Sequence, residues 1–91
     1  MLSEQERLAI GLGREVLRKQ AGLTQEALAA AATTADVPVT VQMVGQAESG
    51  LPVREEKLRA LARALNVAFG LYADPRVQVV PASDLAPAVT P

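Results

Sequence analysis

LRKQAGLTQEALAAAA, residues 17–32, contains the end of one helix, a sharp corner and the start of another helix. Gly22 follows the last residue that favours a helix, and glycine adopts the left-handed backbone conformation that closes a helix without a Cβ clash. Thr24 is placed so that its hydroxyl caps the helix that begins at Gln25. We therefore expect two helices that are joined by a tight corner and cross steeply.

The segment before this corner, residues 3–21, has the pattern of one long helix. Ser3 and Glu6 have the spacing of a capping box, in which each side chain satisfies a backbone N–H group of the other residue. Apolar residues recur at helical spacing and form a stripe made of Leu8, Ile10, Leu12, Val16 and Leu17. Gly11 and Gly13 each lower the helix propensity by about 1 kcal/mol relative to alanine. The first turns of this helix are therefore expected to be loosely held.

After Ala32 the sequence predicts a loop and a third helix. Residues 33–40, TTADVPVT, are rich in β-branched residues and contain Pro38, so we expect a loop there. Thr40 is placed to cap a helix that runs to about Ser49. This third helix is expected to turn two residues toward the core, Val44 and Ala47, and three toward solvent, Gln42, Met43 and Gln46.

The clearest amphipathic segment is a fourth helix, expected from Arg54 to about Asn66 after a break at residues 50–52. Its apolar residues follow the i, i+3, i+4, i+7 pattern of one helix face and are Leu58, Leu61, Ala62 and Leu65. Together these segments predict a mainly α fold with four helices in residues 1–66.

Beyond the fourth helix the apolar pattern favours strands. VAFGLY, residues 67–72, and VQVV, residues 77–80, are short β-favouring runs, and Asp74 and Pro75 supply a turn between them. We expect a strand or hairpin over residues 67–80. Because two strands alone are marginal in water, they are expected to pair with the same strands of a second subunit. The expected dimer interface comprises Val67, Phe69, Leu71, Tyr72, Val77 and Val79.

The chain is therefore expected to have three parts. Residues 1–66 form the helical domain, and residues 67–80 form a β-strand dimerisation element. Residues 81–91 contain three prolines and are expected to be an extended, flexible tail. A chain of 91 residues is long enough for one small domain and too short for two, since domains typically need roughly 100 residues each.

The composition excludes several classes of protein. Nine basic residues are balanced by ten acidic ones, so a nucleic acid or an anionic membrane would have to be bound by a local patch. Cysteine and histidine are absent, which removes disulfides, structural zinc sites and nucleophile–histidine pairs. We therefore expect that the protein is not an enzyme and that it binds neither a cofactor nor a metal ion. The polar start, and the lack of an apolar run of about 20 residues, predict a cytoplasmic protein with no membrane contact.

TQEALA stands at the start of the expected second helix, and ESG stands at the end of the third. Together with the order of the helices, these two motifs make residues 12–66 resemble the Cro/CI-type (XRE) helix-turn-helix family of DNA-binding regulators. In that family an arginine six residues before the Thr-Gln pair forms an internal ion pair with the glutamate that ends the third helix. Arg18 and Glu48 stand at these places. The resemblance implies that the third helix enters the major groove of double-stranded DNA.

The same resemblance implies individual DNA contacts. The positions that reach base edges correspond to Val41, Gln42 and Gln46. Glutamine can bind N6 and N7 of adenine together, whereas Val41 either touches a thymine methyl group or belongs to the core. The N-terminus of the second helix is suited to a phosphate because its backbone N–H groups are free. The expected phosphate-binding residues are Thr24, Gln25, Thr40, Arg54, Lys19 and Lys57.

Two features depart from the family pattern. The turn between the second and third helices has no glycine and about five extra residues, roughly TTADV, which leaves open the angle at which the third helix meets DNA. Residues 14–63 contain seven basic and six acidic residues, so electrostatic affinity for DNA should be low. Useful occupancy would then require a homodimer on an inverted repeat with half-sites about 34 to 36 Å apart, or a partner protein.

The expected strand after the fourth helix makes the layout similar to HipB-type antitoxins, in which such a strand joins the dimer mate. That likeness implies an antitoxin that represses its own operon and binds a toxin protein. A free-standing repressor without a toxin and an adaptor that binds only proteins are the alternatives. An inverted-repeat operator is expected for either repressor.

Overall fold

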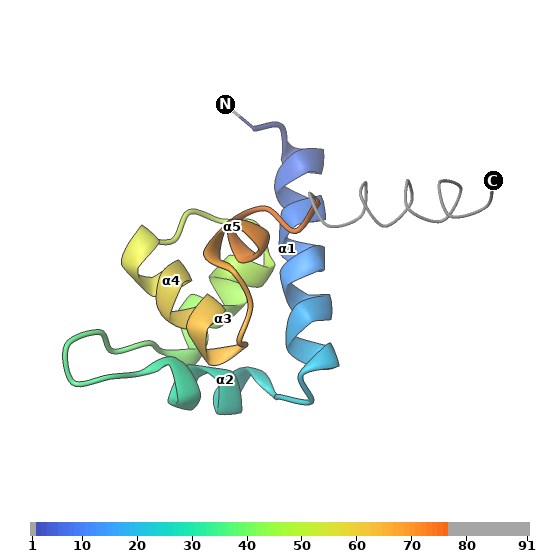
Figure 1. The fold of residues 1–91 in the computed structure, drawn as a ribbon. Helices are drawn as coiled ribbons and strands as arrows, with labels where there is room; N and C mark the ends of the chain where they lie inside the picture. The colour runs from blue at the N-terminus through green and yellow to red at the C-terminus, as the bar shows by residue number, and fades with distance from the viewer. Residues whose placement is uncertain (1, 77–91) are drawn as a thin grey trace.

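The computed structural model describes residues 2–76, which form five helices (Figure 1). The longest helix, α1, stands along one side of the molecule, where it packs against α3 and α5. The second helix, α2, packs against α3 and α4, and α4 packs against α5. The bounds are α1 Glu4–Gln20, α2 Gln25–Ala32, α3 Val41–Glu48, α4 Glu55–Ala64 and α5 Phe69–Ala73. None of these helices is both long enough and apolar enough to cross a membrane.

The starts of the first three helices confirm the predictions from local sequence. Ser3 and Glu6 form a capping box, with the Glu6 N–H donating to Ser3 Oγ over 3.1 Å and the Ser3 N–H donating to Glu6 Oε1 over 2.8 Å. The hydroxyls of Thr24 and Thr40 accept from backbone N–H groups in the first turns of α2 and α3. Gly22 has a φ of +76°, as expected for the residue that closes the corner after α1.

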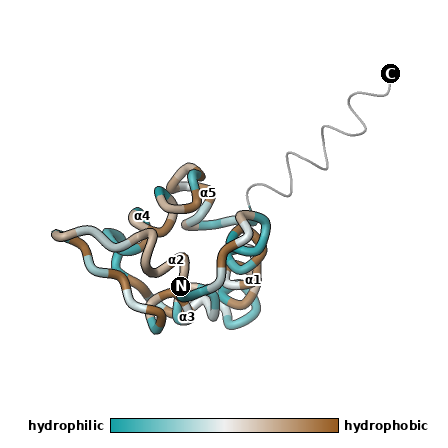
Figure 2. The backbone as a smooth tube through the Cα atoms, turned by 90° about the horizontal axis from the view of Figure 1, so that it is seen from below, coloured by the Kyte–Doolittle hydropathy of each residue, from teal (hydrophilic) through white to brown (hydrophobic). Residues whose placement is uncertain are grey.

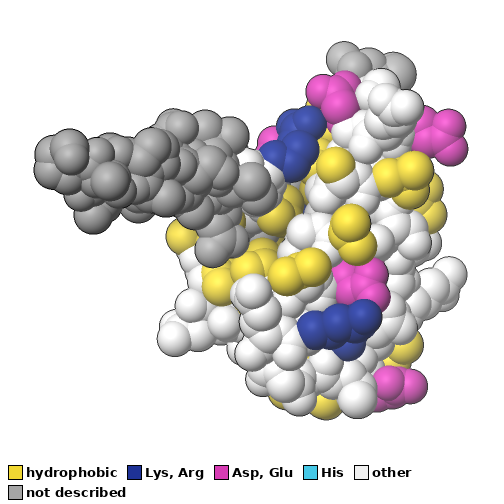
Figure 3. Space-filling model, turned by 90° about the vertical axis from the view of Figure 1, so that its right-hand side faces the viewer, with side chains coloured by type: hydrophobic (Ala, Val, Ile, Leu, Met, Phe, Trp, Pro, Cys, Tyr) yellow, Lys and Arg dark blue, Asp and Glu magenta, His cyan; other side chains and the backbone are white. Residues whose placement is uncertain are grey.

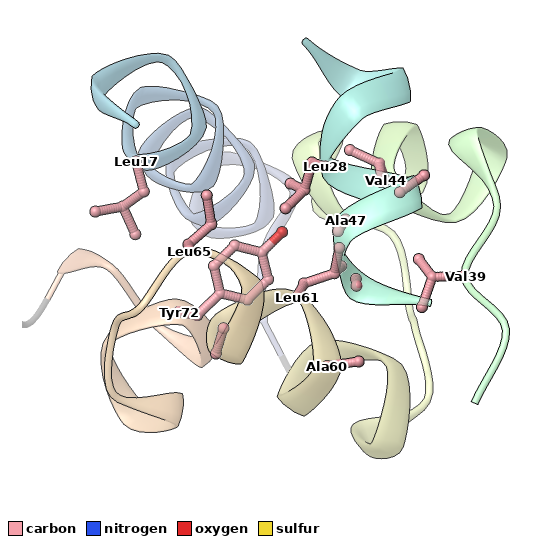
Figure 4. Close-up of a cluster of buried hydrophobic side chains, with 12 residues drawn as sticks. Leu17, Leu28, Val39, Val44, Ala47, Ala60, Leu61, Leu65 and Tyr72 are labelled. Atoms are coloured by element: carbon pink, nitrogen blue, oxygen red, sulfur yellow. The ribbon is translucent and has the colours of Figure 1, made fainter. Parts of the chain in front are cut away.

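The core lies where all five helices meet. Its completely buried side chains include Leu28, Val44, Leu61 and Tyr72. Figure 4 shows the Tyr72 ring beside Leu61 and Leu65, inside the helical bundle. A tyrosine from the C-terminal part of the chain is therefore a central core residue.

The prediction of a strand over residues 67–72 was wrong, because residues 69–73 form the helix α5. Val67 and Leu71 pack against the core, and Phe69 lies under the Arg59 guanidinium at 4.1 Å from its ring centroid. Tyr72 is buried in the core of the chain itself. The part of the expected dimer interface in residues 67–72 therefore cannot pair with a second subunit as a strand. The second expected run and its residues, Val77 and Val79, lie outside the described residues, as does the expected tail.

The apolar face of α1 also differs from the expected one. Ile10 and Leu17 are buried, whereas Leu12 is 61% exposed, and Leu8 and Val16 are exposed with it. Figure 3 views this outer side of the molecule and shows apolar side chains among charged ones. The helix therefore turns only part of its predicted stripe toward the core.

Gly11 allows α1 to lie directly against the end of α3. A Cβ atom at this position would stand 2.5 Å from the backbone oxygen of Glu48, too close for any other residue without a shift of the backbone. The glycine that lowers the helix propensity of α1 thus permits a close helix contact. The capping box at the start of α1 is formed as predicted, and the loosening of its first turns stays a prediction.

Candidate nucleic-acid interface

The third helix turns one face to the core and leaves the opposite side accessible. Val44 and Ala47 are completely buried, as predicted, whereas Gln42 is exposed and Gln46 is half-buried. Residues four apart lie on the same side of a helix, so the two glutamine side chains are neighbours. Met43, which was expected to face solvent, is half-buried and packs against the core.

Val41, the first residue of α3, is 40% exposed. The alternative that it belongs to the core is therefore wrong. Val41 precedes Gln42 at the start of α3, where the helix begins after the Thr40 cap. The accessible side of α3 thus combines one apolar group, near its start, with two amides one turn apart.

The ion pair expected from the resemblance is present between α1 and α3. Arg18 Nε donates to Glu48 Oε2 over 2.6 Å, and Arg18 Nη2 donates to Glu48 Oε1 over 3.1 Å. The remaining guanidinium nitrogen, Nη1, donates to the backbone oxygen of Leu23 over 2.8 Å. The hydrogen bond to Glu48 raises the pKa of Arg18 above its ordinary value, although burial acts in the opposite direction.

Gln25 joins this pair from α2. Its Nε2 donates to Glu48 Oε1 over 3.1 Å. One carboxylate therefore holds side chains from α1 and α2 while standing at the end of α3. Since the Gln25 amide is used inside the protein, a phosphate contact at Gln25 would have to be made by its backbone N–H at the start of α2.

The other expected phosphate contacts differ in how accessible they are. Thr24 and Thr40 are exposed caps at the starts of α2 and α3, and Arg54 is exposed at the start of α4. The Lys19 side chain is 64% exposed and forms an ion pair with Glu15 on the same helix. These four residues carry their polar groups at the surface.

Lys57 does not present its charge in this way. Its side chain is only 12% exposed, and its Nζ donates to the backbone oxygen of Pro38 over 2.6 Å. The nearest acidic group is Glu56, whose Oε2 lies 3.9 Å from the same nitrogen. The expected phosphate contact of Lys57 is therefore not supported, because its ammonium is held against the loop before α3.

Arg14 is a structural residue that the sequence pattern did not single out. It is 6% exposed, and its three guanidinium nitrogens donate to the backbone oxygens of Tyr72, Ala47 and Ala73 over 2.8 to 3.0 Å. Burial lowers the pKa of Arg14 below its ordinary value. The available signal was its position four residues after Ile10 and three before Leu17, on the buried face of α1.

Comparison with protein families matches residues 15–71 to the helix-turn-helix family, over more than half of the chain and into α5. No curated protein and no solved structure matches the chain. Members of this family are DNA-binding transcription regulators and are generally not enzymes. With α3 exposed on one side and fixed to α1 and α2 through Glu48, the chain belongs to the XRE-type helix-turn-helix family of DNA-binding regulators.

Proposed function

We propose that the protein is a transcriptional repressor that binds an inverted repeat as a homodimer, with α3 as the recognition helix in the major groove. The observation that carries this proposal is the pair of accessible amides, Gln42 and Gln46, one turn apart on a helix whose far end is braced by Glu48. Two adjacent amides on a rigid support are suited to base edges, which present fixed donors and acceptors.

The chemistry of these side chains predicts a preference for A·T pairs. Each glutamine can accept from N6 and donate to N7 of one adenine, and such a bidentate contact is worth about 1 to 3 kcal/mol of discrimination against a wrong base. Val41 adds an apolar contact for a thymine methyl group. The expected half-site therefore contains adenine and thymine at neighbouring positions.

Phosphate contacts hold the recognition helix in register. We assign these contacts to Thr24, Thr40, Arg54, Lys19 and the backbone N–H of Gln25. Few of these groups are cationic, and residues 14–63 have nearly balanced charge, so sequence-independent affinity is expected to be low. Two copies on one operator double the number of contacts, which supports a dimer with half-sites about 34 to 36 Å apart.

The antitoxin role predicted from the sequence is not proposed here. It came from the likeness to proteins with a strand after the last helix of the domain, and residues 69–73 are helical instead. The surface expected to join two protomers is largely used inside one protomer. A free-standing repressor, whose dimer contact lies elsewhere, is therefore favoured over an antitoxin.

Selection of duplexes from a random pool at two salt concentrations tests the proposal. The wild-type protein is expected to enrich one palindromic consensus at both salt concentrations. Charge-driven binding would instead enrich no consensus and would become weaker at the higher salt concentration for all duplexes alike. The double variant Gln42→Ala, Gln46→Ala should keep its thermal stability and lose the consensus. A variant that selects the same consensus as the wild type would show that α3 does not read the bases.

The chain offers a matched control for the double variant. Gln5 and Gln20 are also exposed glutamines, but they lie on α1. Replacing both by alanine removes the same two groups and is expected to leave the consensus unchanged. A protein-binding adaptor would give no consensus with any of these proteins.

A further inference from the structure

The lengthened connection between α2 and α3 is closed at its base by one hydroxyl. Thr33 Oγ1 accepts from the Val39 N–H over 2.9 Å and lies 2.9 Å from the backbone oxygens of both Ala29 and Val39. A hydroxyl has one proton and donates to one of these oxygens at a time. In either case Thr33 ties the end of α2 to the residue that precedes the Thr40 cap. Residues 34–38 thus lie outside this closure, and Figures 1 and 2 show the connection projecting from the body.

The projecting part has hydrogen bonds of its own. The Thr34 N–H donates to the Val37 backbone oxygen over 3.0 Å, and the Val37 N–H donates to Thr34 Oγ1 over 3.0 Å. These bonds make a turn through Ala35 and Asp36, both exposed. The insertion is therefore a locally closed turn that is separate from the helices on either side.

A second contact holds the connection from α4. The Lys57 ammonium donates to the Pro38 backbone oxygen, as described above, and Pro38 is followed by Val39, which is buried in the core. The chain is thus fixed at consecutive residues just before α3 begins. Because α3 has only one turn between Thr40 and Val44, a shift of this anchor would be carried directly to Val41 and Gln42.

We propose that Thr33 and Lys57 are positioning residues that set the orientation of α3 and so determine the selectivity of DNA binding. In members of the family a short turn around a glycine joins the second and third helices. Here the two contacts hold the start of α3 in place although the connection is longer. This inference rests on the proposed function, because its main readout is DNA selectivity. It assigns Lys57 an indirect role in place of a phosphate contact.

The salt dependence of binding separates the two roles of Lys57. A phosphate contact that is removed by Lys57→Met would reduce the slope of log K against log salt by about 0.9 and would weaken all duplexes alike. A positioning residue should leave that slope unchanged and lower the preference for the consensus over a scrambled duplex. We expect that preference to fall about tenfold in Lys57→Met and in Thr33→Val, the scale of one lost hydrogen bond of a charged or part-buried group.

Four further variants complete the test. Lys19→Met removes an exposed lysine and is expected to reduce the slope without reducing the preference. Lys57→Arg and Thr33→Ser keep a donor at each anchor and should restore most of the preference. Ala35→Ser changes only the tip of the insertion and should have no effect. A reduced slope with unchanged preference in Lys57→Met would overturn the positioning role.

Amide hydrogen exchange in the free protein provides a readout that does not need DNA. The N–H groups of Met43 and Val44 lie in the first turn of α3 and bond to Thr40. They should exchange faster in Thr33→Val and Lys57→Met than in the wild type, while core amides of α4 stay protected. Unchanged exchange would contradict the inference even if the wild type binds DNA as proposed. Faster exchange in a protein that selects no consensus would contradict the proposed function alone.

Discussion

The side-chain amide of Gln25 donates a hydrogen bond to the Glu48 carboxylate, which also receives two hydrogen bonds from Arg18. Three helices are therefore joined at one acidic group that stands at the C-terminal end of α3. A carboxylate in this position is unfavourable for the helix dipole, so its partners are needed to keep it there. The result is a helix, proposed above to read DNA, that is fixed at its far end and exposed near its start.

Glu48→Gln should destabilise the fold substantially. The variant keeps the size of the side chain but leaves the Arg18 guanidinium without a counter-charge in a mostly buried site. The expected loss in the free energy of unfolding is about 3 kcal/mol, measured by urea denaturation.

Glu55→Gln is the matched control for that measurement. Glu55 forms an exposed ion pair with Arg59 one turn away on α4, over 2.8 Å. Such surface pairs contribute about 0.5 kcal/mol or less. Equal effects of the two variants would show that the pair between α1 and α3 does not brace the domain.

Arg14→Met should release α5 from the body. The variant retains an unbranched apolar stem and removes the Arg14 donors from the backbone oxygens of Tyr72 and Ala73, each of which costs about 1 to 3 kcal/mol when buried without a partner. The Ala47 oxygen still accepts from the Gly50 N–H. Tyr72 is the single tyrosine of the chain, and the chain has no tryptophan. Its near-ultraviolet circular dichroism is thus a specific signal for the docking of α5.

That signal should weaken in Arg14→Met while the helical signal of the domain is largely retained. Arg63→Met, at an exposed position of α4, is the control and should change neither signal. A full near-ultraviolet signal in Arg14→Met would mean that the three hydrogen bonds are not required to hold α5.

The sequence predicted those parts of the fold that local chemistry determines. The caps at Ser3, Thr24 and Thr40 depend on groups within one turn, and the corner depends on Gly22, so each could be recognised without the rest of the molecule. The buried face of α1 could not be recognised in this way. Two faces of α1 have the same helical spacing: the exposed one with Leu8, Leu12 and Val16, and the buried one with Ile10, Arg14 and Leu17. Because an arginine ordinarily faces solvent, the sequence alone did not identify the buried face.

Two leucines test which face of α1 supports the core. Leu17→Ala should cost about 2 to 5 kcal/mol, since it removes a buried side chain from the core. Leu12→Ala removes the same atoms from an exposed position and should change stability by about 0.5 kcal/mol or less. Thermal unfolding of both variants would decide between the predicted stripe and the observed face, and a larger cost for Leu12 would reverse the assignment.

The error at α5 has a long-range cause. The residues of VAFGLY favour a strand when only their local sequence is considered. The contacts that hold this segment as a helix come from residues far away in the sequence. Arg14 binds the carbonyls at the end of α5, and Arg59 covers Phe69. Likewise, the sequence identified Lys57 as a cation near α3, but only the fold shows that Pro38 receives its hydrogen bond. The proposed base-contacting residues could be predicted from the sequence, because the family pattern assigns them to particular positions of α3.

Burial gives Tyr72 a measurable effect on stability at alkaline pH. Its hydroxyl has no hydrogen-bond partner in residues 2–76, and burial raises the pKa of Tyr72 from 10.0 to about 12. The folded protein therefore holds the phenolic proton more tightly than the unfolded chain does. Its contribution to stability is complete below pH 10.0 and is lost as the pH rises through about 12.

Tyr72→Phe removes both the proton and the unpaired hydroxyl from the core. At neutral pH this variant should be more stable than the wild type by about 1 kcal/mol, because no buried polar group is left unsatisfied. The advantage should grow as the pH approaches 12, where the wild type must ionise or unfold. Urea denaturation of both proteins at neutral pH and at about pH 11 measures it, and the difference between them cancels the effects of all groups that the two proteins share. A constant difference across this range would mean that the Tyr72 hydroxyl titrates as it does in the unfolded chain and reaches water in the folded protein.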